Sequence, residues 1–324
     1  MLRRAALLVL ALGLTHFSGV ARTDEPQERT FTDPKKAGPD FLVQGEYEGK
    51  VGADTVVGIQ VIALGDGKFD AVLYHKGLPG AGGDKARLPL KCETTDGVTT
   101  LAGEKFAGII KNGSFTGSLD GAELKLKRVE RQSPTIGAKP PAGAIILFDG
   151  KNADEWANGR IQEEQLLGVG TRTKRAFKNY TLHIEFRTPF MPYARGQGRG
   201  NSGLYLNDQY EFQILDSFGL VGENNECGGY YSFSKPALNT CLPPLAWQTY
   251  DVDFTMAKFD AEGKKTAPAI ATVRLNGVIV HDKYEIPKIN GGGGLNDESK
   301  PGPIFVQDHG NPVHFRNVWI LEKN

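Results

Sequence analysis

The sequence predicts an all-β protein in which a small β domain precedes a larger β-sandwich. Short apolar runs that alternate with polar residues recur along the 324-residue chain, and this period of two is typical of strands with one buried face. Gly-Asp-Gly, Asn-Gly and Asp-Gly turns separate the runs at hairpin spacing. The larger domain shows no sustained apolar stripe of helical period, which favours strands throughout.

Composition and charge are those of an ordinary globular protein. The chain is 40% hydrophobic and 23% charged, and lysine plus arginine equals aspartate plus glutamate at 38 each. The length is enough for about two domains. Because the charges balance, nothing in the composition indicates nucleic acid or an anionic membrane surface as the partner.

The N-terminus has the pattern of a secretory signal peptide, residues 1–21. Arg3 and Arg4 precede an apolar run from Ala5 to Leu14, and small residues lead up to a predicted cut near Ala21. The run is too short to span a membrane as a helix. We therefore expect an exported protein, periplasmic or extracellular, that is not embedded in a membrane.

The chain after the signal divides into four predicted segments. Residues 22–39 are charged, with little that can pack, and predict a disordered lead-in. Residues 40–130 hold strand-like runs such as TVVGIQVIAL and KFDAVLYH, which predict the small accessory β domain. Residues 131–143 are a linker rich in proline and glycine. Residues 144–324 hold longer runs such as YTLHIEFRT and YEFQILDS, which predict the sandwich.

Export permits disulfides, and the sequence has three cysteines, Cys92, Cys227 and Cys241. Cys227 and Cys241 bracket a short loop, so a disulfide between them is the first hypothesis. Cys92 is then left over, and we interpret it as a small buried apolar side chain. Without a Cys-x-x-Cys pair the sequence gives little support for a zinc site.

Two strands of the larger domain carry carboxylates on a polar face. Because successive side chains of a strand point to opposite faces, Glu185 and Arg187 share a face opposite Phe186. By the same rule Glu211 and Gln213 share a face. A solvated sheet with cross-strand charge pairs is the structural alternative for each strand. The repetition of acid, amide and arginine groups on one face favours a site.

A third strand offers a polar face with space beside it. Asn201, Gly203 and Tyr205 share this face, which is small enough to leave room for a ligand. Asp216 follows the Glu211 strand with the opposite parity, so only a bulge or the strand end can aim it at the same site.

The C-terminal stretch PGPIFVQDHGNPVHFRNVWI predicts two strands joined by a turn. Gln307 ends the first strand and His309 lies in the turn. On a regular last strand Arg316 and Asn317 point to opposite faces, so one is a site candidate and the other is structural. His314 is interpreted as a surface residue.

Familiar catalytic signatures are missing from the sequence. There is no Gly-x-Ser-x-Gly elbow, His-Glu-x-x-His, P-loop or EF-hand loop. The glycines of RGQGRGNSG and the run Gly291–Gly294 are interpreted as loops, because no strand-to-helix pattern surrounds them. The Glu-x-Asp-x-x-Glu motif of laminarinase-type sandwich glycosidases is also missing, which disfavours an ordinary two-carboxylate glycosidase.

From about Ala144 to the C-terminus, the order of segments resembles a known family of secreted bacterial proteins, the 3-keto-disaccharide hydrolases. The segments are FDG…W, NYTLHIEFR, GNSGLYL, YEFQILD, WQTYDV, VRLNGVIV and GPIFVQDHGNPVHFRNVWI. The family is similar to the concanavalin-like jelly roll in fold. Residues 22–143 lie outside the resemblance, so the first β domain is an addition that it does not explain.

The resemblance implies cleavage of a glycoside whose C3 hydroxyl has already been oxidised to a ketone. The ketone acidifies the C2 proton, so a base can remove it, the aglycone can leave C1, and water can add to the enone. This route needs a base, a group that polarises the ketone and an acid. It does not need two carboxylates flanking the anomeric carbon.

On this basis we assign hypothetical roles to the polar residues. Glu211 or Glu185 is the base, His309 is the acid or second base, and Arg187 and Arg316 polarise the keto oxygen. The substrate-binding candidates are Asn201, Tyr205, Gln213, Asp216, Gln307 and Asn317. The sequence requires no cofactor, although a divalent cation such as Ca²⁺ would suit carboxylate and carbonyl ligands.

A carbohydrate-binding module without catalysis is the alternative function. Jelly rolls of this type bind glycans, and the aromatic residues that could stack on sugars are Trp156, Tyr205, Tyr230, Tyr231 and Trp247. Core packing is the other interpretation, which we favour for the two tryptophans. A third hypothesis, an adhesion or attachment role for the first domain, rests only on its β-turn character.

Overall fold

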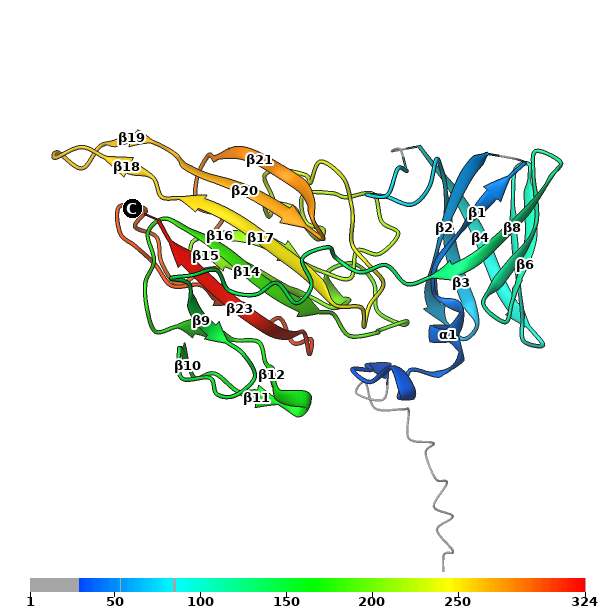
Figure 1. Ribbon diagram of the computed structural model, residues 1–324, viewed down its shortest axis with the longest axis horizontal. Coiled ribbons are helices and arrows are strands. Elements are labelled where there is room, and N and C mark those ends of the chain that lie inside the picture. The colour runs from blue at the N-terminus through cyan, green and yellow to red at the C-terminus, as the bar shows by residue number, and fades with distance from the viewer. Residues whose placement is uncertain (1–28, 53, 84–85, 324) are drawn as a thin grey trace, which may run out of the picture.

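The computed structural model describes residues 29–52, 54–83 and 86–323, which form a β-barrel and a β-sandwich (Figure 1). The predicted signal peptide, residues 1–21, and residues 22–28 lie outside the described residues. Strands make up 48% of the model and helices 5%, which confirms the all-β prediction. Among the described residues, no helix is long and apolar enough to cross a membrane.

The barrel is closed and antiparallel. Each strand pairs with the next along the chain, and the last pairs with the first. Its strands are β1 (Gly45–Val51), β2 (Thr55–Gly65), β3 (Lys68–His75), β4 (Arg87–Thr95), β5 (Val98–Gly103), β6 (Phe106–Lys111), β7 (Ser114–Leu119) and β8 (Ala122–Val129). Closure leaves no free strand edge, so this small unit needs no partner strand from the sandwich.

The segment before the barrel is ordered from residue 29, which corrects the predicted lead-in. It contains the 3-10 helix η2 (Pro34–Lys36) and the helix α1 (Gly38–Val43). Phe31 forms a β-bridge with Phe190 of the sandwich, and the Phe31 and Phe41 rings lie 6.1 and 5.3 Å from the Phe190 ring. Burial of these aromatic side chains against the barrel core stabilises the segment. The charged composition of residues 22–39 does not predict this contact.

The sandwich consists of two antiparallel sheets. The five-stranded sheet has the order β10 (Trp156–Ala157), β13 (Thr171–Thr173), β22 (Phe305–Val306), β15 (Ser202–Leu206), β16 (Tyr210–Ile214). The larger sheet has the order β11 (Ile161–Gln162), β12 (Leu166–Leu167), β23 (His314–Glu322), β14 (Tyr180–Arg187), β17 (Gln248–Thr255), β20 (Ala269–Leu275), β21 (Val278–Ile286), and β9 (Ile145–Phe148) also pairs with β23. The short hairpin of β18 (Lys258–Phe259) and β19 (Lys265–Ala267) and the 3-10 helices η3 (Glu163–Gln165) and η4 (Gly196–Gly198) complete it. This arrangement confirms the predicted jelly-roll sandwich.

One apolar core fills the space between the two sheets. Ile184 and Phe186 point into it from β14, and Phe212 and Ile214 point into it from β16, all fully buried. The residues between them on each strand must therefore point outward. Because the strands belong to different sheets, their outward side chains lie on opposite faces of the sandwich.

The segment between barrel and sandwich lies against the larger sheet. The Ser133 and Thr249 hydroxyls are 2.6 Å apart, and Thr135 donates a hydrogen bond to the Asp251 carboxylate at 2.6 Å. The backbone N–H of Gly137 donates to Glu185 at 2.6 Å. These bonds fix the connection to strands β14 and β17.

The structure contradicts the predicted disulfide, because all three cysteines are free thiols. Cys227 and Cys241 are buried near each other, but each thiol has further partners. Cys241 donates to the carbonyl oxygen of Leu242 at 3.5 Å, and the Cys227 sulfur lies 3.7 Å from the Tyr250 hydroxyl. Cys92 lies in the barrel core, where burial raises its pKa to about 12.

Replacing Phe190 by alanine should weaken the contact between barrel and sandwich. Phe190 is fully buried in the barrel's core cluster although it belongs to a loop of the sandwich. Loss of a buried phenylalanine costs about 3–5 kcal/mol. Urea denaturation followed by circular dichroism measures the cost. A loss below about 1 kcal/mol would show that Phe190 does not tie the two parts together.

Candidate functional site

The outer face of the five-stranded sheet brings together predicted site residues from β15, β16 and the end of β22. Tyr205 pairs with Glu211, and Gly203 pairs with Gln213, across β15 and β16. Gln307 follows β22 and its side chain reaches Tyr205. We call this surface the Glu211 face, consisting of Asn201, Tyr205, Glu211, Gln213 and Gln307.

Glu211 has the chemistry of a base at neutral pH. Its side chain is buried, with 4% of the residue exposed. Burial raises its pKa to about 7, and a 2.7 Å hydrogen bond donated by the Tyr205 hydroxyl to Oε2 opposes part of this rise. Burial also raises the pKa of Tyr205, so the phenol keeps its proton. The carboxyl can therefore take up and release a proton near pH 7.

Three side-chain amides of the Glu211 face have oxygens that lack hydrogen-bond donors. Gln197 Oε1 accepts hydrogen bonds from Asn201 Nδ2 at 3.2 Å and from Gln213 Nε2 at 3.0 Å. Gln307 Nε2 donates to the Tyr205 hydroxyl at 3.1 Å. These bonds orient the amides and leave buried oxygens of Asn201, Gln213 and Gln307 with no hydrogen-bond donor among the described residues. Buried acceptors are normally satisfied, so these oxygens are candidates to accept a hydrogen bond from a ligand hydroxyl or a water.

The turn that holds His309 borders the Glu211 face. Gln307 donates its backbone N–H to Gly203 at 2.9 Å, and the Asn311 side chain accepts the backbone N–H of Asn201 at 2.8 Å. These two bonds fix both ends of the turn beside the start of β15. His309 itself is exposed to solvent. The predicted acid therefore belongs to a turn beside the face and is accessible to solvent.

The sequence reasoning missed Arg172 and Gln197. The Arg172 guanidinium lies 3.9 Å from the centre of the Phe305 ring and donates to Asp208 at 2.7 Å. Arg172 pairs with Phe305, and Phe305 pairs with Tyr205, so Arg172 lies on the same face of the sheet as Tyr205. Strand β13 has three residues, too few to show alternation. Gln197 lies in the glycine-rich loop RGQGRGNSG. The spacing of its glycines does not indicate a functional residue.

The loop Gly291–Gly294 packs over the Glu211 face. A Cβ atom on Gly292 would collide with the Tyr205 hydroxyl, so only glycine fits there. The neighbouring N–H of Gly294 donates to the Asp208 carboxylate at 3.0 Å. The loop therefore covers part of the Glu211 face. The contacts that hold it there could not be predicted from its glycine-rich composition.

Glu185, the other predicted base, lies on the outer face of the larger sheet. Its carboxylate accepts hydrogen bonds from Arg316 Nε at 2.6 Å, Asn317 Nδ2 at 2.8 Å and the N–H of Gly137 at 2.6 Å. Burial alone would raise its pKa, but hydrogen bonds from His183 and these three groups lower it to about 2. A carboxylate that is ionised and fully engaged cannot serve as a base near neutral pH. Glu185 anchors the connecting segment instead.

A β-bulge changes the predicted parity of the last strand. The register of β14 with β23 shifts between His183 and Glu185, and Asn317 has a positive φ of 44°. A bulge inserts an extra residue, so two successive side chains reach one side. Arg316 and Asn317 therefore both contact Glu185, which corrects the expectation that only one could share its site.

The predicted polarisers of the keto oxygen, Arg187 and Arg316, also lie on the outer face of the larger sheet. The guanidinium groups of Arg187 and Arg316 lie 5.0 and 4.0 Å from the centre of the Trp247 ring. Arg187 also pairs with Glu164 at 3.3 Å. The core of the sandwich separates both arginines from Glu211, so they cannot act on a ligand held there.

Asp216 has a structural contact in place of the predicted sugar contact. Its carboxylate accepts a 2.6 Å hydrogen bond from Arg199, which also donates to the carbonyl oxygen of Ala63 in the barrel at 2.9 Å. Both charged side chains are buried. The pair therefore joins the sandwich to strand β2.

Comparison with known proteins identifies the larger unit. Residues 143–321 match the family model of the 3-keto-alpha-glucoside-1,2-lyase-like domain. The chain belongs to this family. Both faces described above lie inside the family domain, and the barrel lies outside it.

Solved structures resemble the family domain. A candidate glycosyl hydrolase of Parabacteroides distasonis is 32% identical, with a TM-score of 0.51, over 56% of this chain and 85% of that one. A second candidate glycosyl hydrolase of the same organism is 18% identical, with a TM-score of 0.42, over 56% of this chain and 94% of that one. The comparison with curated proteins found no match.

The Glu185 anchor should make the family domain sensitive to acid. The lowered pKa of Glu185 means that its ionised form stabilises the fold fully above about pH 4.5, its usual value, and that this contribution is lost as pH falls towards about 2. Glu185→Gln should reduce the free energy of unfolding by roughly 3 kcal/mol at pH 7. The gap between variant and wild type should close between these two pH values.

Urea denaturation followed by tryptophan fluorescence, repeated from pH 7 to pH 2.5, measures this gap. A difference that stays constant across the range would contradict the anchor role.

Proposed function

We propose that this protein is a carbohydrate-active enzyme that cleaves 3-keto glycosides at the Glu211 face. The observation that carries the proposal is Glu211 itself, a buried carboxyl with a pKa of about 7 on the same sheet face as three amide oxygens that lack donors. Membership of the 3-keto-alpha-glucoside-1,2-lyase-like family supports the substrate class. The likeness to a candidate glycosyl hydrolase at 32% identity supports action on a glycosidic bond.

In the proposed reaction Glu211 removes the C2 proton of the keto sugar. A pKa near the working pH suits this step, because the base is ionised in part and still strong enough to take the proton. Tyr205 holds Oε2, so Oε1, which accepts no hydrogen bond from the described residues, is the atom that receives the proton. The electrons of the C2–H bond form the enolate of the C3 ketone.

Breakage of the C1–O bond follows and completes the elimination. The aglycone oxygen takes a proton from His309, which we assign as the acid because its turn borders the face. Water then adds to the enone: its oxygen bonds to C1, its released proton goes to His309, which regains the proton it gave to the aglycone, and the proton held by Glu211 returns to C2. The products are the free 3-keto sugar and the aglycone alcohol.

The charge that develops on the keto oxygen needs a stabilising partner. We assign this role to Arg172, in place of Arg187 and Arg316, because it lies on the same sheet face as Tyr205. The oxygens of Asn201, Gln213 and Gln307 accept hydrogen bonds from the remaining sugar hydroxyls. The expectation that no cofactor is required, with Ca²⁺ as an alternative polariser, stays a prediction.

Substrate entry requires movement of the loop Gly291–Gly294. The loop contacts Tyr205 directly, and both Tyr205 and Glu211 are buried beneath their surroundings. Glycine-rich segments change backbone conformation at low cost, and closure over a bound sugar would exclude water from the elimination step.

Binding of a glycan without cleavage is the second candidate function. The amide oxygens that lack donors would accept hydrogen bonds from sugar hydroxyls whether or not the glycan is cleaved. The aromatic residues favour it less. Trp156 and Tyr230 are in the core, and Trp247 lies against two arginines on the opposite face. Tight binding of plain glycans with no turnover of any 3-keto sugar would select this alternative.

We also propose that the protein is exported through its N-terminal signal. The predicted cut near Ala21 would leave Arg22 as the first residue of the mature chain. Mass spectrometry of the protein from the periplasmic or extracellular fraction of its host tests this start.

The Glu211→Gln variant should lose cleavage of a 3-keto glucoside while remaining folded. Removing a general base costs about 100-fold or more in kcat/KM, measured as release of 4-nitrophenol from 4-nitrophenyl 3-keto-glucoside. His309→Ala should slow the same release. Glu185→Gln is the matched control, because it makes the same change on the opposite face. If both Glu211→Gln and His309→Ala release 4-nitrophenol as fast per folded molecule as the wild type and the control, the assignment of the two catalytic groups is wrong.

The pH profile should report the ionisation of Glu211. Because the base acts when deprotonated, kcat/KM should rise as pH increases through about 7, the raised pKa of Glu211. Tyr205→Phe removes the hydrogen bond that favours the ionised form, so the midpoint should move to higher pH. A midpoint that stays in place or moves to lower pH in this variant would contradict the role of Tyr205.

A further inference from the structure

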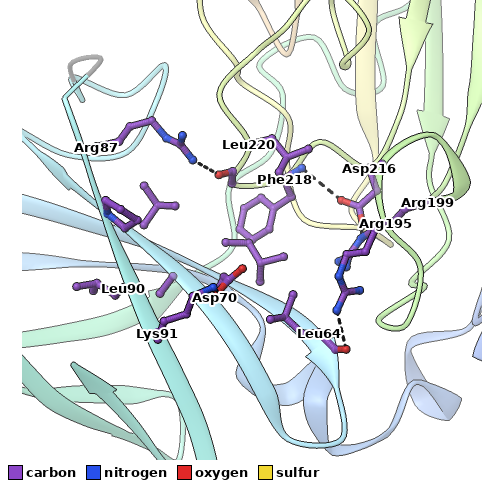
Figure 2. A pocket seen from close by; sticks show the side chains of 16 residues that line it. Leu64, Asp70, Arg87, Leu90, Lys91, Arg195, Arg199, Asp216, Phe218 and Leu220 are labelled. Carbon is purple, nitrogen blue, oxygen red and sulfur yellow. Dashed lines mark hydrogen bonds and ion pairs between the residues drawn. The ribbon is translucent and has the colours of Figure 1, made fainter. Parts of the chain in front are cut away.

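A pocket of about 420 Å³ lies where the barrel meets the sandwich (Figure 2). Strands β2, β3 and β4 form one wall, and the loops before β15 and after β16 form the other. Its volume is within the range of small-molecule sites. One wall lies outside the family domain, and none of the residues of the Glu211 face lines the pocket. We call it the junction pocket.

The walls of the junction pocket are largely apolar. Ile62, Val72 and Pro89 contribute from the barrel, and Phe218 and Leu220 contribute from the sandwich. The two walls meet closely, because a Cβ atom on Gly219 would collide with the Ile62 side chain. An apolar molecule in the pocket would therefore contact both parts of the protein.

Positive charge is in excess around the pocket. Its carboxylates are neutralised, since Asp70 pairs with Lys91 and Asp216 pairs with Arg199. Two more guanidinium groups line it, those of Arg87 and Arg195, and neither forms an ion pair with a described carboxylate.

Both of these guanidinium groups donate to backbone carbonyl oxygens. Arg87 donates to Gly219, and Arg195 donates to Leu64 at 2.8 Å. The buried Nε of Arg87 has no hydrogen-bond acceptor among the described residues. Neither guanidinium has a described carboxylate to neutralise it, so an anionic group bound in the pocket would supply the missing charge.

We propose that the junction pocket binds a small apolar organic acid. Its hydrocarbon body packs against Val72, Pro89 and Phe218, and its carboxylate pairs with the positively charged guanidinium of Arg87. Arg195 adds a second positive charge at the rim. The ligand bridges strands of the barrel and loops of the sandwich, which gives the barrel a binding role that goes beyond the proposed cleavage reaction.

Isothermal titration of the full chain with 2-naphthoate tests the site, with 2-naphthalenemethanol as the neutral probe of similar shape. A charge-assisted hydrogen bond should make the acid bind at least about tenfold more tightly than the alcohol. Arg87→Met should remove this preference, and Arg160→Met, an exposed arginine away from the pocket, should keep it. Val72→Phe should weaken both probes by filling the pocket.

Glu211→Gln should bind 2-naphthoate with unchanged affinity, which separates this test from the proposed reaction. No saturable binding of the acid to the wild type would overturn the proposal. Equal affinity for acid and alcohol, or unchanged affinity for the acid in Arg87→Met or Val72→Phe, would overturn it as well. The comparison of the two probes needs only the wild type, so a variant that fails to fold does not block the test.

Discussion

Both sheets of the sandwich bury their apolar side chains in one shared core, and this constraint decides where each carboxylate goes. Phe186 and Phe212 point into the core from different sheets, so Glu185 and Glu211 point away from each other. Two glutamates that look interchangeable in the sequence thus enter different environments. The surroundings of each one then set its ionisation and its role.

The difference between the two glutamates follows from their partners. Glu185 receives hydrogen bonds from a guanidinium, an amide and a backbone N–H, which hold its charge and anchor the connecting segment. Glu211 receives a single hydrogen bond, from the neutral phenol of Tyr205. This bond is too weak to offset the rise in pKa that burial causes. An ionised carboxylate in a full set of donors is structural, whereas a carboxyl poised near neutral pH can transfer protons. Burial is common to both, so burial alone does not mark a catalytic group.

Alternation within strands was readable from the sequence because it is local. It placed Glu211 with Gln213, and Glu185 with Arg187, correctly on outward faces. It did not tell which sheet each strand joins, because that depends on pairing between distant segments. Strand β22, from the end of the chain, lies between β13 and β15.

Alternation along the strands also did not predict local irregularities or contacts between distant segments. The bulge at Asn317 reverses the parity that a regular strand would have. The ordered segment around Phe31 depends on a contact with Phe190, which lies far away in the sequence. Asp216 joins Arg199 at a junction with a barrel that the family resemblance does not cover.

Under the proposed function, substrate binds on one face of the sandwich, and the structural charges lie on the other. A crystal structure of Glu211→Gln soaked with a 3-keto glucoside tests this most directly. We expect sugar on the Glu211 face, with hydroxyls on the oxygens of Asn201, Gln213 and Gln307 and the loop Gly291–Gly294 displaced. Sugar bound beside Trp247 and Arg316, with the Glu211 face empty, would contradict the proposed function.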